Sequence, residues 1–152
     1  MDLRPARAHE AELLSELALA SKGHWDYDEA FLAACREELT LRPDEIERRR
    51  TTVAEEGGRV LGFATLEGAP PAGALGMMFV APEAIGRGAG RLLFEHIGAE
   101  ARRLGFTRLT IDADPNAEPF YRAMGAVRIG ETPSGSIPGR VLPLMEYAVT
   151  PR

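Results

Sequence analysis

The sequence predicts an α/β fold: one mixed, mostly antiparallel sheet of about six to seven strands, flanked by about four helices. Segments rich in apolar or β-branched residues alternate with segments of helical periodicity, in the order β, α, α, β, β, β, α, β, α, β, β. The length of 152 residues suits one compact domain with a sizeable core. We find neither an internal repeat nor a linker, so residues 1–152 are predicted to form a single domain.

The chain begins with a short strand and two helices. The strand lies around Leu3, and apolar residues at helical spacing predict a helix over residues 8–21. The stretch that follows breaks this pattern. A second helix is then predicted through Leu39, with Asp26 or Asp28 as its N-cap.

A helix start and a hairpin come next. Residues 42–50 are predicted to form a charged turn, in which Pro43 and the acidic residues beside it suit a helix start. Residues 51–55 and 60–66 are rich in β-branched or apolar residues, and Gly57 and Gly58 lie between them. This arrangement predicts a β-hairpin with the glycine pair at its turn.

The second half predicts four strands and two helices. Residues 74–82 are apolar on both faces, which is typical of a central strand, and Gly105 suits the end of the long helix that follows. Asp114 is expected to cap the short helix, with Pro115 in its first turn. Pro143 indicates an irregular or edge strand. The remaining elements are a helix over 88–104, a strand over 107–114, a helix over 115–125, and strands over 126–131 and 141–149.

Composition narrows the classes of function. A net charge of −5 argues against a nucleic-acid binder, which usually has a basic face. The single cysteine, Cys35, excludes an internal disulfide. We find neither a window of about 18 apolar residues nor the apolar run of a signal peptide. The sequence therefore predicts a cytoplasmic protein without membrane or nucleic-acid partners, and we predict no metal site.

Three glycines, Gly86, Gly88 and Gly90, stand at the junction between a strand and the long helix. Glycine lets the backbone approach a ligand closely, and the free N–H groups of a first helical turn bind anions such as pyrophosphate. The alternative is a turn that merely packs tightly. A P-loop is excluded because no lysine is followed by Ser or Thr, and the GxGxG spacing is wrong for a dinucleotide fold.

The segment "VAPEAIGRGAGRLL" resembles the acetyl-CoA loop of the GCN5-related N-acetyltransferases, the GNAT family. That family's pattern is a strand ending V-x-P, then [QR]-x-x-G-x-[GA], then a helix. Gly88 and Gly90 match the two small positions, whereas Ile85 stands where Gln or Arg is usual.

A second segment, "DPNAEPFYRAMGA", resembles the family's N-x-x-A-x-x-x-Y-x-x-x-G-F. Ala117, Tyr121 and Gly125 match, while Asp114 replaces Asn and Ala126 replaces Phe. The two motifs stand in the family's order, and the resemblance covers nearly the whole chain.

The resemblance implies a GNAT-like sheet with a splayed central strand pair, whose unpaired backbone holds the pantetheine arm of acetyl-CoA. The N–H groups that follow it would hold the pyrophosphate, with two arginines adding charge. The cofactor-binding residues implied in this way are Met78, Phe79, Val80, Gly86, Arg87, Gly88, Ala89, Gly90, Arg91, Asp114 and Tyr121.

Tyr121 matches the family's tyrosine near the sulfur of CoA, which implies a catalytic role. A phenol can protonate the leaving thiolate; the alternative is an aromatic residue that only packs. The general base stays open among several side chains: Asp112, Glu118, Glu55, His24 and His9.

The acceptor pocket is expected between the first two helices, where family members shape it. Trp25 and Tyr27 are the predicted substrate-binding residues, as an aromatic wall beside Asp26 or Asp28. The loop between the last two strands is expected to close the other side.

The predicted function is an acetyl-CoA-dependent N-acetyltransferase that acts by direct attack of a primary amine of a small molecule, amino acid or peptide. The alternative from another class is a non-catalytic acyl-CoA-binding sensor, and a dehydrogenase domain is disfavoured by the glycine spacing. The family resemblance also suggests a homodimer, with an edge strand at residues 141–149 as a candidate contact.

Overall fold

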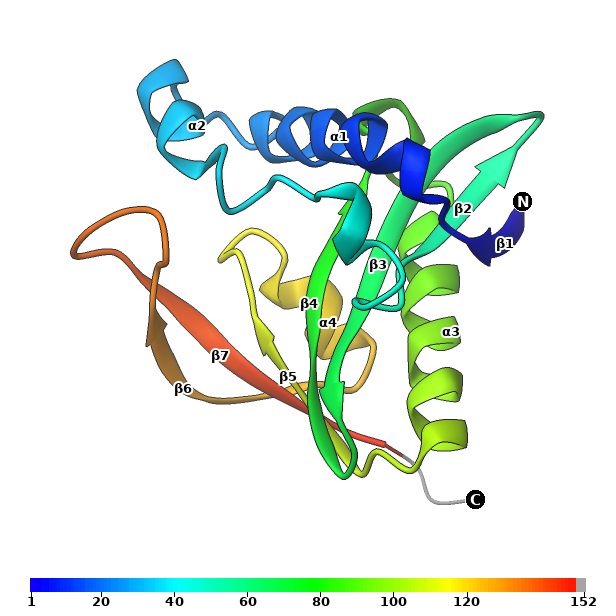
Figure 1. The fold of residues 1–152 in the computed structure, drawn as a ribbon. Coiled ribbons are helices and arrows are strands. Elements are labelled where there is room, and N and C mark those ends of the chain that lie inside the picture. The colour runs from blue at the N-terminus through cyan, green and yellow to red at the C-terminus, as the bar shows by residue number, and fades with distance from the viewer. Residues whose placement is uncertain (150–152) are drawn as a thin grey trace.

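The computed structural model describes residues 1–149, which contain one seven-stranded sheet and four α-helices (Figure 1). The strand order is β1-β2-β3-β4-β5-β7-β6, and all neighbours are antiparallel except β4 and β5. The mixed, mostly antiparallel fold predicted from the sequence is confirmed. The strands are β1 (Asp2–Pro5), β2 (Thr52–Glu56), β3 (Arg59–Ala69), β4 (Ala72–Val80), β5 (Arg108–Asp112), β6 (Val127–Pro133) and β7 (Val141–Ala148). The helices are α1 (Ala11–Gly23), α2 (Glu29–Cys35), α3 (Ala89–Leu104) and α4 (Glu118–Ala123), with 3-10 turns η1 (Ala8–Glu10), η2 (Pro43–Glu45) and η3 (Pro82–Ala84).

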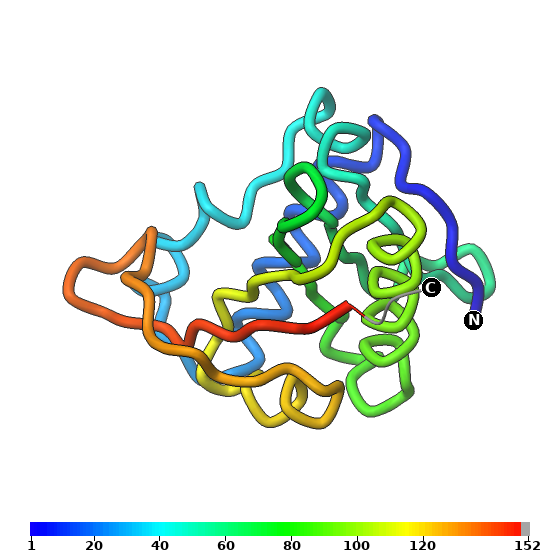
Figure 2. The backbone as a smooth tube through the Cα atoms, turned by 90° about the horizontal axis from the view of Figure 1, so that it is seen from below, coloured from blue at the N-terminus to red at the C-terminus, as the bar shows by residue number. Residues whose placement is uncertain are grey.

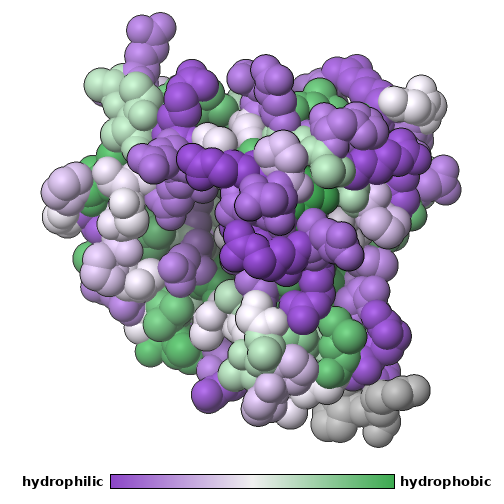
Figure 3. Space-filling view, viewed as in Figure 1, coloured by the Kyte–Doolittle hydropathy of each residue, from purple (hydrophilic) through white to green (hydrophobic). Residues whose placement is uncertain are grey.

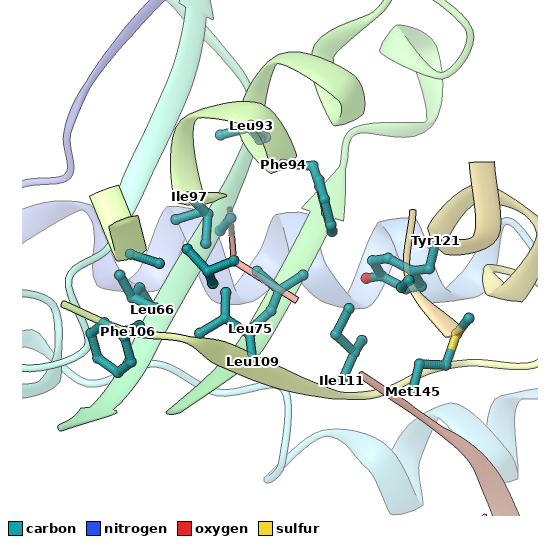
Figure 4. Packing of buried hydrophobic residues seen from close by; sticks show 14 of the residues in the cluster. Leu66, Leu75, Leu93, Phe94, Ile97, Phe106, Leu109, Ile111, Tyr121 and Met145 are labelled. Carbon is teal, nitrogen blue, oxygen red and sulfur yellow. The ribbon is translucent and has the colours of Figure 1, made fainter. Parts of the chain in front are cut away.

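Helices cover both faces of the sheet, and alternation along the strands supplies a core to each face. Val53 belongs to the core under α1, whereas the next residue, Ala54, belongs to the core under α3. Phe63 and Ala64 divide between the two faces in the same way. Figure 4 shows the second core, in which α3 and α4 pack on β4, β5 and β7.

The central strands β4 and β5 are splayed. They pair in parallel only where Ala72–Ala74 face Arg108–Thr110. Beyond Ala74 the strands diverge, as Figure 1 shows, while Met78 and Val80 keep their partners on β3. The splayed strand pair implied by the sequence motifs is therefore confirmed, and it leaves one side of β4 without a strand neighbour.

Pro143 predicted an irregular or an edge strand, and the edge alternative is wrong. β7 lies between β5 and β6, so β6 forms this edge of the sheet. The carbonyl of Pro143 accepts a hydrogen bond from the N–H of Ala113, so the nitrogen of Pro143 also faces the β5 side. The proline has no N–H with which to return this bond, and β5 ends one residue earlier, at Asp112.

Two predicted helix boundaries were also wrong. α2 is capped by Asp28, whose side chain accepts from the N–H of Phe31 at 2.8 Å, but it ends at Cys35 rather than at Leu39. The N–H of Arg36 bonds to the carbonyl three residues back, so the α-helical register stops there.

α4 likewise begins later than its motif indicated. It starts at Glu118 with Pro119 in its first turn, whereas Asp114 and Pro115 precede it in a turn. The carboxylate of Asp114 accepts from the backbone N–H of Asn116 at 2.8 Å, so it stabilises this turn and does not cap the helix.

Candidate active site

A cavity of about 710 Å³ opens at the splay between β4 and β5. Its walls come from the end of α1, the segment after α2, the start of α3, α4, and the loop between β6 and β7. Figure 2 shows that this loop lies beside α2, although about a hundred residues separate them in the chain. Figure 3 shows a recess on this side, left of centre, with hydrophilic residues around it.

The unpaired side of β4 forms one wall. Met78, Phe79 and Val80, predicted to hold the pantetheine arm, all line the cavity. Since β5 offers these residues no partner among residues 1–149, their backbone polar groups on that side are free to bind an extended ligand.

A bulge in β4 shapes the same wall. The register with β3 shifts between Ala64 and Leu66, so that two residues, Gly76 and Met77, face Thr65 alone. The Thr65 hydroxyl accepts from the N–H of Met77 at 2.8 Å and lies 2.7 Å from a carboxylate oxygen of Glu67. The bulge is thus held in place by side chains.

The glycine loop forms the far end of the cavity. Gly86 and Gly88 have φ of 86° and 90°, a left-handed conformation that glycine adopts without strain. Gly88 is the N-cap of α3, and a Cβ on either glycine would meet no atom within 4 Å. The loop therefore leaves open space before the first turn of a 16-residue helix, where N–H groups and the helix dipole favour an anion.

The third glycine has a packing role. A Cβ on Gly90 would stand 3.4 Å from the ring of Phe120 and 3.5 Å from the methyl carbon of Met78. The packing interpretation of the glycine cluster therefore applies to Gly90, whereas anion binding at Gly86 and Gly88 stays a prediction.

The other predicted residues of the loop differ in their surroundings. Arg91 and Ile85 line the cavity, and Arg91 lies 3.5 Å from Glu95 on the next turn of α3. Arg87 forms an ion pair with Glu56 and does not line the cavity, and Ala89 is buried.

Tyr121 reaches from α4 into the core and also lines the cavity. Its ring packs near that of Phe94, with a centroid distance of 6.2 Å (Figure 4). The ring of Phe120 lies 5.4 Å away. The side chain is 7% exposed, and no hydrogen bond to its hydroxyl occurs among residues 1–149. Burial, together with the charge of Asp114, raises the pKa of Tyr121, so the phenol stays protonated at neutral pH.

A cluster of charged and aromatic side chains closes the cavity near Tyr121. Asp114 accepts from Lys22 at 2.6 Å and from the hydroxyl of Tyr27 at 2.9 Å. Arg140, from the β6–β7 loop, donates to the same hydroxyl at 2.8 Å. Burial disfavours the charged carboxyl of Asp114, but Lys22 outweighs it and holds the pKa of Asp114 below its ordinary value.

The two predicted substrate-binding aromatics lie in different settings. Trp25 lines the cavity and is 38% exposed. Tyr27 stacks on Phe31 at a centroid distance of 4.0 Å and belongs to the closing cluster rather than to the cavity wall.

Among the candidate bases, Asp112 alone lines the cavity. Burial raises the pKa of Asp112, and the neighbouring carboxylate of Glu38 adds to the effect. The other candidates lie elsewhere: Glu55 pairs with Arg4, Glu118 pairs with Arg122 and Arg128, and neither His9 nor His24 lines this cavity.

The sequence did not indicate four charged residues that line the cavity: Lys22, Glu38, Glu67 and Arg140. None of these four residues belongs to a sequence motif that we recognised. In the described part of the chain, no group of His, Cys, Asp and Glu could hold a metal ion, and no helix is long and apolar enough to cross a membrane.

Residues 14–135 match the family model of the acetyltransferase (GNAT) domain. The chain belongs to the GNAT acetyltransferase family. Its enzyme class, N-acetyltransferase, and acetyl-CoA as the donor follow from this membership, as the sequence motifs predicted. No curated protein matches the chain.

Solved structures agree with the GNAT fold. A GCN5-related N-acetyltransferase from Rhodopseudomonas palustris has a TM-score of 0.81 and 27% identity, and the match covers 97% of this chain and 94% of that one. PaiA N-acetyltransferase from Thermoplasma acidophilum, in complex with coenzyme A, has a TM-score of 0.80 and 19% identity, with coverage of 97% and 98%. YncA, a putative acetyltransferase from Salmonella typhimurium with acetyl-CoA, has a TM-score of 0.72 and 21% identity, with coverage of 100% and 95%.

Proposed function

We propose that this GNAT enzyme transfers an acetyl group from acetyl-CoA to a primary amine of a small molecule, amino acid or peptide by direct attack. The observation that carries the proposal is one continuous cavity that joins the glycine loop, the hydroxyl of Tyr121 and the carboxylate of Asp112. Acetyl-CoA supplies the acetyl group as a thioester, which is already activated for attack by an amine.

The chain's own backbone would bind the donor. The free side of β4 at Met78–Val80 suits the pantetheine arm, because the arm can pair there like an added strand. The N–H groups at the start of α3 suit the pyrophosphate. Arg91 lies on the cavity wall and can add a charge-assisted contact to the pyrophosphate. Asp114 lies near enough to Tyr121 for its negative charge to raise the pKa of the phenol.

Two side chains would move the protons. Asp112 accepts a proton from the acceptor ammonium, and the raised pKa of this carboxyl makes it a better base than an ordinary aspartate. The amine nitrogen then forms the bond to the acetyl carbon, and the bond from that carbon to sulfur breaks. Tyr121 donates its proton to the departing sulfur, because its raised pKa keeps the phenol protonated until then. The nitrogen loses its second proton as the amide forms. That proton restores the phenol of Tyr121, and the proton taken up by Asp112 leaves to solvent.

The test is thiol release from acetyl-CoA with a panel of amines, beside a calorimetric measurement of CoA binding. We expect both binding and amine-dependent release. CoA binding without turnover on any amine would favour the sensor alternative, and absence of CoA binding would contradict the proposed cofactor site.

The homodimer and the cytoplasmic location stay predictions. The edge strands of the described sheet are β1 and β6. β6 lies beside β7, and its Val127 and Ile129 are 63% and 53% exposed, so we place the dimer contact at β6 in place of β7. Sedimentation of the wild-type protein against Ile129→Lys would test the dimer.

A further inference from the structure

The cavity lining carries charges of both signs. The cluster that closes the cavity near Tyr121 contains two cations, Lys22 and Arg140, and one carboxylate, that of Asp114. Two further carboxylates, those of Asp112 and Glu38, also line the cavity. A ligand with both an anionic group and an ammonium group would complement this distribution.

Arg140 has spare hydrogen-bonding capacity toward the cavity. Its guanidinium donates to Tyr27 and lies 3.8 Å from Asp114, which is already bound by Lys22 at 2.6 Å. The guanidinium also lies over the ring of Phe31, 4.9 Å from its centroid, so its position is fixed. A guanidinium has several N–H donors in a planar fork, and the remaining ones suit a carboxylate.

The part of the cavity around Asp112 suits an ammonium group. No hydrogen bond or ion pair to the side chain of Asp112 occurs among residues 1–149, whereas Glu38 accepts from the hydroxyl of Ser136. Two carboxylates facing one cavity are each stabilised by a cation between them. Tyr121 lines the same cavity, and its hydroxyl has no hydrogen-bond partner in the described part of the chain, so it would mark the place of acetyl transfer under the proposed function.

The position of Asp112 relative to Arg140 suits a small ligand. Asp114, which lies 3.8 Å from Arg140, follows Asp112 by two residues, and the intervening Ala113 still bonds to β7. Two extended residues span roughly 7 Å along the backbone, so Asp112 and the cluster that contains Arg140 are close neighbours in the cavity lining. One small ligand with an ammonium and a carboxylate suits both.

We propose that the acceptor is a free amino acid, whose carboxylate binds Arg140 while its amine lies against Asp112. The assignment rests on the proposed function and narrows its acceptor from amines in general to those that carry a carboxylate near the reacting nitrogen. It makes Arg140 a specificity-determining residue, and Tyr27 and Phe31 its positioning residues.

The experiment compares matched acceptors at saturating acetyl-CoA: each amino acid, its carboxamide and its decarboxylated amine. A charge-assisted hydrogen bond is worth about 1.5–3 kcal/mol, so we expect kcat/KM to favour the free acid by about 10- to 150-fold. The amine of the carboxamide loses its proton more readily than that of the free acid, so more of it is in the reactive, unprotonated form. This difference favours the carboxamide and therefore acts against the preference that we expect.

Variants separate specificity from packing. Arg140→Gln is expected to remove the preference by lowering kcat/KM for the acids alone, and Arg140→Lys to retain part of it. Arg122→Gln serves as the control, because Arg122 is exposed on α4 and pairs with Glu118 outside the cavity. Melting temperature and CoA affinity are measured for each variant.

Equal use of acids and amides by the wild type would overturn the inference. An equal loss for both in Arg140→Gln would also overturn it, as would a loss of CoA affinity in that variant, which would assign Arg140 to the donor. Turnover of other amines with no turnover of any amino acid would also overturn it, yet would leave the proposed function standing. Absence of turnover with every acceptor would contradict both.

Discussion

The carboxylate of Glu67 occupies the space beside Gly76 on the neighbouring strand. A Cβ built on Gly76 would stand 1.8 Å from Oε2 of Glu67, far inside any contact distance. That oxygen accepts from Arg49 at 2.7 Å and lies 2.7 Å from the hydroxyl of Thr65. Gly76 thus leaves room for a bound carboxylate, and any larger residue there must displace the side chain of Glu67 from its hydrogen bonds.

We expect Gly76→Ala to lower the free energy of unfolding by about 1.5–3 kcal/mol, because Glu67 must give up hydrogen bonds that involve a charged group. In a Glu67→Ala background the same substitution should cost much less. A double-mutant cycle by urea denaturation measures this coupling. Equal costs in the two backgrounds would show that Glu67 does not set the requirement for glycine.

A second prediction concerns the glycine loop. Gly88→Ala and Gly58→Ala are matched, since both glycines have positive φ, 90° and 80°, and open space around an added Cβ. Both variants should lose about 1–2 kcal/mol of stability through left-handed strain. Only Gly88→Ala should lower CoA affinity, by about tenfold or more. Calorimetry showing the same CoA affinity in both variants would contradict the placement of the phosphates at this loop.

A third prediction concerns Tyr121. Removing its hydroxyl in Tyr121→Phe should reduce kcat by about 10²–10⁴, the range of general acid catalysis, with little change in CoA affinity. Tyr147→Phe is the control, because Tyr147 packs on the same Phe94 ring at 4.9 Å but does not line the cavity. A wild-type kcat in Tyr121→Phe, at equal folded fraction, would restrict Tyr121 to packing.

The fourth prediction is a pH dependence. Burial and Glu38 raise the pKa of Asp112, and a base acts only when deprotonated, so kcat/KM should fall as pH drops through this raised pKa. The limb should therefore lie at higher pH than for an ordinary aspartate. Asp112→Asn should lower kcat/KM by about 10²-fold or more and remove the limb. If the fall of kcat/KM at low pH persisted in Asp112→Asn and disappeared in Glu118→Gln, the general base would be Glu118 and not Asp112.

The last prediction concerns stability at acid pH. Hydrogen bonds from Arg4, at 2.7 and 2.9 Å, lower the pKa of Glu10 from 4.5 to about 2. Because the folded state binds fewer protons, the contribution is complete above pH 4.5 and is lost as pH falls toward 2. It amounts to on the order of 3 kcal/mol. Glu10→Gln should flatten this part of the stability curve measured with urea, and an unchanged curve would contradict the linkage.

Local signals explain what the sequence predicted well. The long helix was expected over 88–104 and spans Ala89–Leu104, because Gly88 and Gly105 mark its two ends with left-handed backbone. The splayed strand pair and the glycine loop could be predicted because the motifs that indicate them are each contained in one continuous stretch of sequence. The edge-strand alternative for Pro143 was wrong, because a proline is tolerated both at a sheet edge and at an unpaired position inside a sheet. The sequence alone does not distinguish these two positions.

The charged residues of the cavity illustrate what could not be predicted. Lys22 and Asp114 meet at 2.6 Å from opposite halves of the chain, and Glu38 meets Ser136 across the cavity wall. Such pairs depend on the strand order and on where each loop crosses the sheet. No spacing between neighbours in the sequence encodes them.

The position of β7 bears on how the chain is completed during synthesis. β5 and β6 emerge from the ribosome before the strand that separates them, so they have no native pairing with each other. Until residues 141–148 have left the exit tunnel, the nascent chain presents the bare edge of β5 beside an unfinished core. Binding of cofactor and substrate must therefore await the insertion of β7, which closes the sheet after every other strand has been made.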